Sequence, residues 1–140
     1  MDLRSLIHPC RPDQLPSVLF LLDMTGLRFG CDSPASLEAQ LAHDPASILV
    51  AEWDGLVVGC IFVLYNPLLT GLYHLAVDPF HQRLGLGQAL LAAAEDQSRA
   101  RGTACFVGYV VADNKASLAL CAKHGYATYA HPITCVTKLT

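Results

Sequence analysis

Apolar residues in the first third of the chain recur at helical spacing. Asp13 can cap an apolar segment that Gly26 ends, which predicts a helix to about residue 25. Ser33-Pro34 then places a capping hydroxyl and a first-turn proline before Leu37 and Leu41, which lie on one helical face. We therefore expect two helices in succession before the pattern changes.

Ahead of these helices, Leu3 to Ile7 is short and apolar enough for a strand. The segment from His8 to Pro12 contains two prolines, and proline lacks the N–H that a strand or helix interior needs. We expect this segment to be a turn.

In the middle of the chain the helical spacing gives way to nearly continuous apolar runs. Ile48 to Trp53 and Leu56 to Tyr65 flank Asp54-Gly55. Such a pair between apolar runs predicts a hairpin, because both turn positions need positive φ. Leu72 to Val77 is expected as a third strand, ended by Asp78-Pro79.

Beyond this strand, segments with a helical pattern alternate with segments typical of strands. Gly85 to Arg101 is amphipathic, Cys105 to Val111 is rich in valine and aromatic residues, and Asn114 to His124 opens on a capping asparagine. Tyr126 to Tyr129 and Ile133 to Leu139 are expected as two final strands. The pattern predicts a mixed α/β domain in which the strands flanking the long helix are parallel, with a right-handed crossover.

Composition narrows the classes of protein that fit. The 140 residues are 53% hydrophobic and 15% charged, as in one globular domain over 1–140. A net charge of −3 with no basic stripe argues against nucleic-acid binding. The longest apolar run is too short for a bilayer, and no targeting peptide is recognisable. The six cysteines are scattered and make no zinc spacing with histidine, so we expect a reduced, cytoplasmic protein without a metal.

The junction Gln82-Arg83-Leu84-Gly85-Leu86-Gly87 carries the candidate chemistry, because it joins a strand to a helix. Helix N-termini have unpaired N–H groups and partial positive charge, and glycines let an anion approach the backbone. We predict a phosphate or pyrophosphate site at the amides of Arg83 to Gln88. Gly87 lacks the Lys-Ser/Thr of a P-loop, and Leu90 stands where a dinucleotide fingerprint needs glycine. The alternative is that two glycines only ease the turn.

Two motifs stand in register along the chain. Val77-Asp78-Pro79 precedes Gln82-x-x-Gly85-x-Gly87, and Asn114 is followed at eleven and twelve residues by Gly125-Tyr126. These motifs, and the order of elements over nearly the whole chain, resemble the GCN5-related N-acetyltransferase (GNAT) family. The resemblance implies one domain over 1–140, with a central mixed, mostly antiparallel sheet of roughly six or seven strands and about four flanking helices.

The resemblance also implies that acetyl-CoA is the co-substrate and that no metal takes part. The loop amides would hold the pyrophosphate, and the strand before them would pair with the pantetheine arm. The acceptor, a primary amine, would attack the CoA thioester directly in a ternary complex, and homodimers are common in the family. The cofactor-binding residues implied in this chain are Leu75, Ala76, Val77, Gln82, Arg83, Leu84, Gly85, Leu86, Gly87, Gln88 and Asn114.

Cys121 departs from the family pattern, since many members have here a tyrosine that protonates the leaving thiolate. A thiol has an ordinary pKa of roughly 8.5, against roughly 10 for tyrosine, so Cys121 can still donate but is shorter. Three alternatives stay open: Cys121 is a packing residue, the acid is water or Tyr126 or Tyr129, or the domain senses acyl-CoA without catalysis. An unrelated α/β domain that binds another phosphate ligand is a further alternative.

A base for the amine is sought on the third strand, where some family members have a carboxylate and this chain has Tyr73 and His74. Histidine titrates near neutral pH, which makes His74 the candidate base, with a packed strand histidine as the alternative. Strand alternation predicts opposite faces for the two side chains, so only one would face the acceptor. Tyr73 is then the candidate to line the acceptor pocket, and the identity of the amine stays open.

Overall fold

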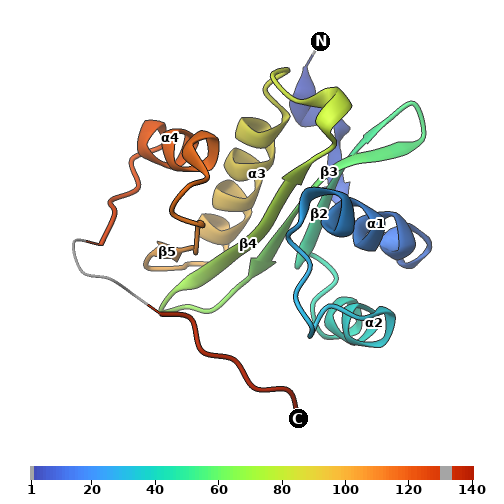
Figure 1. The fold of residues 1–140 in the computed structure, drawn as a ribbon, viewed down its shortest axis with the longest axis horizontal. Helices are drawn as coiled ribbons and strands as arrows, with labels where there is room; N and C mark the ends of the chain where they lie inside the picture. The colour runs from blue at the N-terminus through green and yellow to red at the C-terminus, as the bar shows by residue number, and fades with distance from the viewer. Residues whose placement is uncertain (1, 130–133) are drawn as a thin grey trace. The chain divides into compact units, whose positions relative to one another are not determined.

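Residues 2–129 and 134–140 are described by the computed structural model, in which the chain divides into two units, 1–108 and 109–140. The first unit holds a five-stranded sheet with helices on both faces (Figure 1). Its elements are the 3₁₀ helix η1 (Leu3–Leu6), β1 (Ile7–Pro9), η2 (Pro12–Gln14), α1 (Leu15–Thr25), α2 (Pro34–His43), β2 (Ile48–Trp53), β3 (Leu56–Leu64), β4 (Thr70–Val77), η3 (Pro79–His81), α3 (Leu86–Ala100) and β5 (Phe106–Val107).

The sheet has the strand order β1-β2-β3-β4-β5, with β1 to β4 antiparallel and β4 and β5 parallel. The predicted mixed, mostly antiparallel sheet and the parallel pair around the long helix are therefore confirmed. Neighbouring residues of β3 face opposite ways. Cys60 lies in a core with residues of α1 and α2, whereas the space beside Gly59 is occupied by Leu90 of α3. Thus α3 covers one face of the sheet, and α1 and α2 cover the other (Figure 1).

Local signals in the sequence fix several element ends as expected. Gly26 ends α1 in the left-handed conformation with φ of 73°. The Ser33 hydroxyl accepts a hydrogen bond from the Ser36 amide and caps α2. Asp54 and Gly55, with φ of 50° and 77°, make the tight turn between β2 and β3. Each of these positions depends on residues within one turn, which is why the sequence predicts them.

The N-terminal segment differs from the prediction. Leu3–Leu6 is a 3₁₀ helix, and the strand is Ile7–Pro9, which pairs with β2 through His8↔Val50. The turn predicted from His8 is wrong for His8 and Pro9, because β1 is an edge strand, where a missing N–H can face away from the ladder. The capping role predicted for Asp13 is also wrong, since it lies inside η2 and its carboxylate accepts from Arg11 Nε at 3.2 Å.

The C-terminal third has fewer strands than predicted. The strand expected over 105–111 shortens to Phe106–Val107. Residues 126–129 and 134–139 are not in a strand, and Ile133 lies outside the described residues. Strand propensity is realised only where a neighbouring strand supplies hydrogen-bond partners, and β-branched Val136 is 87% exposed. The sheet of the described residues therefore has five strands rather than six or seven.

The second unit contains α4 (Lys115–Lys123) as its helix, among the residues described there. The Asn114 side chain accepts from the Ser117 amide and caps α4, as expected, and Gly125 follows with φ of 86°. The amide of Tyr126 donates to the Cys121 carbonyl at 3.0 Å. None of the described helices, in either unit, is both long and apolar enough to cross a membrane.

Candidate active site

The junction between β4 and α3 is shaped by polar side chains and two left-handed residues. Asp78 accepts from the Phe80 amide at 2.9 Å, and Gln82 Nε2 donates to the Val77 carbonyl at 3.1 Å. Arg83 and Gly85 then take φ of 65° and 92°. These contacts turn the chain over residues 78–85, between the end of β4 and the start of α3.

Gly85 is the N-cap of α3, a helix of 15 residues. Its carbonyl accepts the first helical bond, from the Ala89 amide at 3.0 Å. The amides of Leu86 and Gly87 precede that bond, so the helix itself offers them no acceptor. Together with the helix dipole they form a positively polarised end that favours an anion.

The free edge of β4 lies next to this helix end. β5 pairs with β4 only at Thr70↔Phe106 and Gly71↔Val107. From Leu72 onward, β4 has no partner strand on that side among the residues described. The main chain of Leu75, Ala76 and Val77, predicted to pair with pantetheine, belongs to this stretch.

A β-bulge interrupts β4 just before these residues. Cys60 pairs with Ala76 and Phe62 pairs with Tyr73, so two residues, His74 and Leu75, stand opposite the single Ile61. His74 adopts φ of 53°, uncommon for a residue with a side chain. The bulge changes the direction in which the next side chains point.

The bulge overturns the prediction that Tyr73 and His74 lie on opposite faces of the sheet. Tyr73 packs against the core cluster shared with α1, and this cluster contains Phe62. The His74 ring packs edge-on against Phe62, with centroids 4.8 Å apart. Both side chains therefore contact the α1 side, because an extra residue in one strand breaks the two-residue alternation.

His74 contacts a carboxylate in a way that the sequence did not indicate. Its Nε2 lies 2.8 Å from Oδ2 of Asp32, in the loop between α1 and α2, and both side chains are 8% exposed. Phe29 from the same loop packs edge-on against the imidazole, with centroids 5.2 Å apart. Asp32 directly precedes the Ser33 cap and carries no motif of its own, so only the folded chain shows this pairing.

The thiol of Cys60 completes the surroundings of His74. It donates from Sγ to the His74 carbonyl at 3.4 Å. Burial raises the pKa of the Cys60 thiol to about 12, so the group stays protonated at neutral pH and can donate. Cys60 thus holds the main chain of His74, and Asp32, Phe29 and Phe62 hold its side chain.

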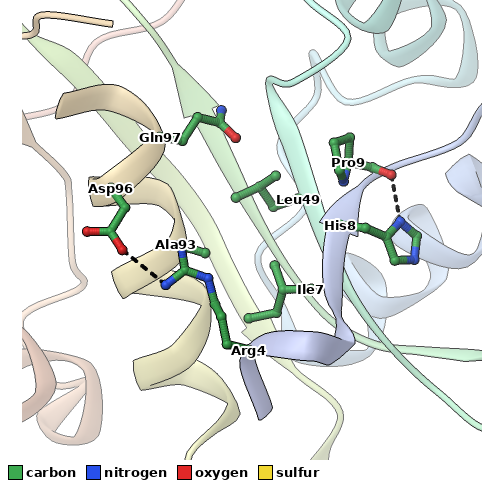
Figure 2. A pocket seen from close by; sticks show the side chains of 8 residues that line it. All are labelled: Arg4, Ile7, His8, Pro9, Leu49, Ala93, Asp96 and Gln97. Carbon is green, nitrogen blue, oxygen red and sulfur yellow. Dashed lines mark hydrogen bonds and ion pairs between the residues drawn. The ribbon is translucent and has the colours of Figure 1, made fainter. Parts of the chain in front are cut away.

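Two shallow grooves lie along α3. One, of about 440 Å³, runs beside the helix start and is lined in part by Leu3, Gly85 and Gln88. The other, of about 320 Å³, lies between β1 and α3, where Arg4 reaches across to Asp96 at 3.1 Å (Figure 2). Leu49 lines this second groove from the α3 face of the sheet, so the groove is separate from His74 on the α1 side.

The sequence model of one protein family, the acetyltransferase (GNAT) family, matches residues 11–126. The chain belongs to the GNAT acetyltransferase family. As a GNAT member it is an acyltransferase enzyme, and the resemblance carried by the glycine junction and the Asn114 motif is confirmed.

Relatives and solved structures agree with this assignment. An acetyltransferase of Photorhabdus laumondii is 36% identical over 121 residues, which cover 86% of this GNAT chain and 85% of the relative. Ard1 from Thermoplasma volcanium has a TM-score of 0.79 at 24% identity, over 89% of this chain and 83% of that one. Ribosomal-protein-alanine N-acetyltransferase from Brucella melitensis has a TM-score of 0.72 at 23% identity, over 86% and 83%. These likenesses establish the GNAT fold.

Most of the predicted site residues lie along one path through the first unit of this GNAT protein. Tyr73 and His74 stand at the bulge, 75–77 follow on the free edge of β4, and 82–88 form the turn into α3. Asn114 and half-buried Cys121 lie in the second unit, at the start and within α4. No cluster of three or more possible metal ligands occurs in the described ranges.

Proposed function

We propose that this GNAT enzyme moves the acetyl group of acetyl-CoA to a primary amine by direct attack in a ternary complex, with residues 1–140 acting as one domain. The observation that carries the proposal is the polarised N-terminus of α3, which the turn over 78–85 joins to the free edge of β4. An extended thioester arm and a diphosphate are the two parts of CoA that such neighbouring features suit.

The main-chain amides from Gln82 to Gln88 would hold the pyrophosphate, with the Arg83 side chain free to add charge. The main chain of Leu75, Ala76 and Val77 would pair with the pantetheine arm as an added strand does. Asn114 is proposed to approach the same arm on family resemblance alone. Glycine at 85 supports this placement, because its φ of 92° turns the chain where the diphosphate would lie.

The chemistry needs one base and one acid. The amine nitrogen bonds to the thioester carbonyl carbon, its proton passes to His74, and the C–S bond breaks to release CoA thiolate. Main-chain N–H groups at the β4 bulge would stabilise the developing oxyanion. Tyr73, on the same side of the sheet as His74, would line the acceptor pocket. The thiolate takes a proton from Cys121, a role that rests on family resemblance alone.

Calorimetric titration with acetyl-CoA, followed by thiol release with a panel of primary amines, tests the function. We expect binding and amine-dependent release; binding without release from any amine would leave a sensor rather than a transferase. Gly87→Asp places a carboxylate at the helix end and should weaken binding of CoA about tenfold or more through charge repulsion. Gly87→Ala is the matched control, since it adds a methyl group without charge, and equal affinity of the two variants would contradict the pyrophosphate placement.

A further inference from the structure

We propose that Asp32 is a positioning residue that fixes the tautomer of His74, so that Nδ1 is the nitrogen that accepts the proton of the acceptor amine. This inference rests on the proposed acetyl transfer and adds the residue that orients its base. It follows from the buried contact between the loop before α2 and the bulge of β4.

The contact decides which ring nitrogen carries hydrogen. A carboxylate oxygen offers only lone pairs, so the imidazole nitrogen that lies 2.8 Å from it, Nε2, must carry hydrogen. In a neutral imidazole the other nitrogen then holds the lone pair, because the bond made by one nitrogen sets the state of the other. Nδ1 is therefore the basic atom of His74.

Asp32 is itself held in place by its own loop. The same Oδ2 accepts from the Phe29 amide at 2.8 Å. The Asp32 carbonyl accepts from Arg28 Nε at 3.0 Å, and Arg28 Nη1 in turn binds Asp23 Oδ2 at 2.9 Å. A carboxylate fixed in this way can hold an imidazole in one orientation, which a solvent-exposed partner cannot.

The position of the pair argues for a functional role beyond stability. A buried carboxylate is costly to desolvate, and well-packed apolar residues of the same volume would stabilise the fold at least as well. His74 also keeps a left-handed φ of 53°, an arrangement that persists where surrounding contacts over-determine it. Both features meet at the bulge, directly before residues 75–77 on the free edge of β4.

Several titratable or charged groups surround the imidazole. Asp32 faces it from the loop and Arg28 holds that loop, Cys60 on β3 donates to the main-chain carbonyl of His74, and Tyr73 precedes it on β4. Cys60 stays protonated, since burial raises the pKa of its thiol to about 12. Asp32 is thus a carboxylate in direct contact with the ring.

Kinetics of Asp32→Asn test the role of the charge. During turnover the N–C bond forms, the C–S bond breaks, the amine proton moves to Nδ1 and the departing thiolate is protonated. Asp32→Asn keeps the shape but presents either an amide oxygen or an amide N–H to the ring. We expect kcat to fall about tenfold or more and the KM for acetyl-CoA to stay the same. When Asp32→Asn is combined with His74→Asn, kcat should fall no further than in His74→Asn alone, because the two residues act as one unit.

A measurement on the free enzyme separates this inference from the proposed function. ¹⁵N NMR of histidine-labelled protein, with the His74 signals assigned by their loss in His74→Asn, should show Nε2 protonated and Nδ1 unprotonated. Asp32→Asn should change that pattern. The inference is overturned if Nδ1 carries the proton in the wild type, or if Asp32→Asn leaves kcat unaltered in an enzyme that turns over normally. Absence of turnover by the wild type with every amine would instead refute the proposed function.

Discussion

Nε2 of His74 lies 2.8 Å from Oδ2 of Asp32, and each of these side chains is only 8% exposed. His74 holds this position with φ of 53°. Asparagine adopts that region more readily than most residues, so His74→Asn removes the imidazole with the least added backbone strain. This substitution separates the chemistry of the ring from the conformation of the bulge.

For His74→Asn we expect kcat to fall about 100- to 10,000-fold, the usual contribution of a general base. The affinity for acetyl-CoA should not change, because the imidazole of His74 is not among the proposed cofactor contacts. Steady-state kinetics and calorimetry measure the two quantities. His8→Asn is a matched control, since His8 also lies near a carboxylate, 3.8 Å from Glu52, but on β1. Full activity of His74→Asn would remove His74 from the mechanism.

Gly85 and Gly102 form a natural pair for testing the loop, because both have φ of 92°. A side chain at Gly85 would also meet Leu3 Cδ1 at 3.2 Å, whereas at Gly102 there is nothing within 4 Å. Alanine at either position should cost about 1–2 kcal/mol of unfolding free energy through its left-handed φ, and Gly85→Ala should cost more. Urea unfolding measures this difference.

Only Gly85→Ala should also weaken the binding of acetyl-CoA, since Gly102 lies at the far end of α3. Calorimetric titration of the two variants compares their affinities for acetyl-CoA, and both variants carry a similar backbone strain. Equal affinity in the two variants would show that the turn at Gly85 serves the fold alone.

How much of this fold can be predicted from sequence depends on how local the determining contacts are. Gly26, the Ser33 cap and the Asp54-Gly55 turn are predicted correctly, because each depends on a few neighbouring residues. The strands expected after residue 125 are predicted wrongly, because strand propensity alone does not make a strand; a neighbouring strand must also pair with it.

The candidate site divides in the same way. The glycine junction was visible in the sequence, since its residues are contiguous. The bulge at His74 was not, because it arises from the pairing of Phe62 with Tyr73 and of Cys60 with Ala76. Asp32 was missed for a related reason: a single loop aspartate gains its role only when the loop closes over β4.

The close approach of α3 to the sheet depends on Gly59. A side chain at Gly59 would lie 2.9 Å from Leu90 Cδ1 and 3.3 Å from the Ala76 carbonyl, and Leu90 is fully buried. Gly59→Ala should therefore lower the unfolding free energy by about 1–3 kcal/mol through overpacking. Leu90→Ala alone should cost about 2–5 kcal/mol by leaving a cavity.

The double variant of Gly59 and Leu90 tests whether these two residues are in direct conflict. Removal of the Leu90 methyl groups makes room for the new one, so the double variant should lose clearly less stability than the sum of the single variants. Denaturant unfolding of all four proteins gives the coupling. Strict additivity would show that the Ala76 carbonyl, and not Leu90, limits the space.

Stability at alkaline pH should depend on Cys60. Burial raises the pKa of this thiol from 9.0 to about 12 in the folded protein. Between those values the unfolded chain loses the proton while the folded chain keeps it, so the contribution to stability is complete below pH 9 and is lost as pH rises toward 12.

The free energy of unfolding should fall in this window by up to about 1.4 kcal/mol per pH unit more in the wild type than in Cys60→Ala. Urea unfolding at several pH values measures both slopes, with Cys31→Ala, an exposed cysteine, as the control that should follow the wild type. Parallel curves for wild type and Cys60→Ala would mean that the Cys60 thiol ionises as readily in the folded protein as in the unfolded chain.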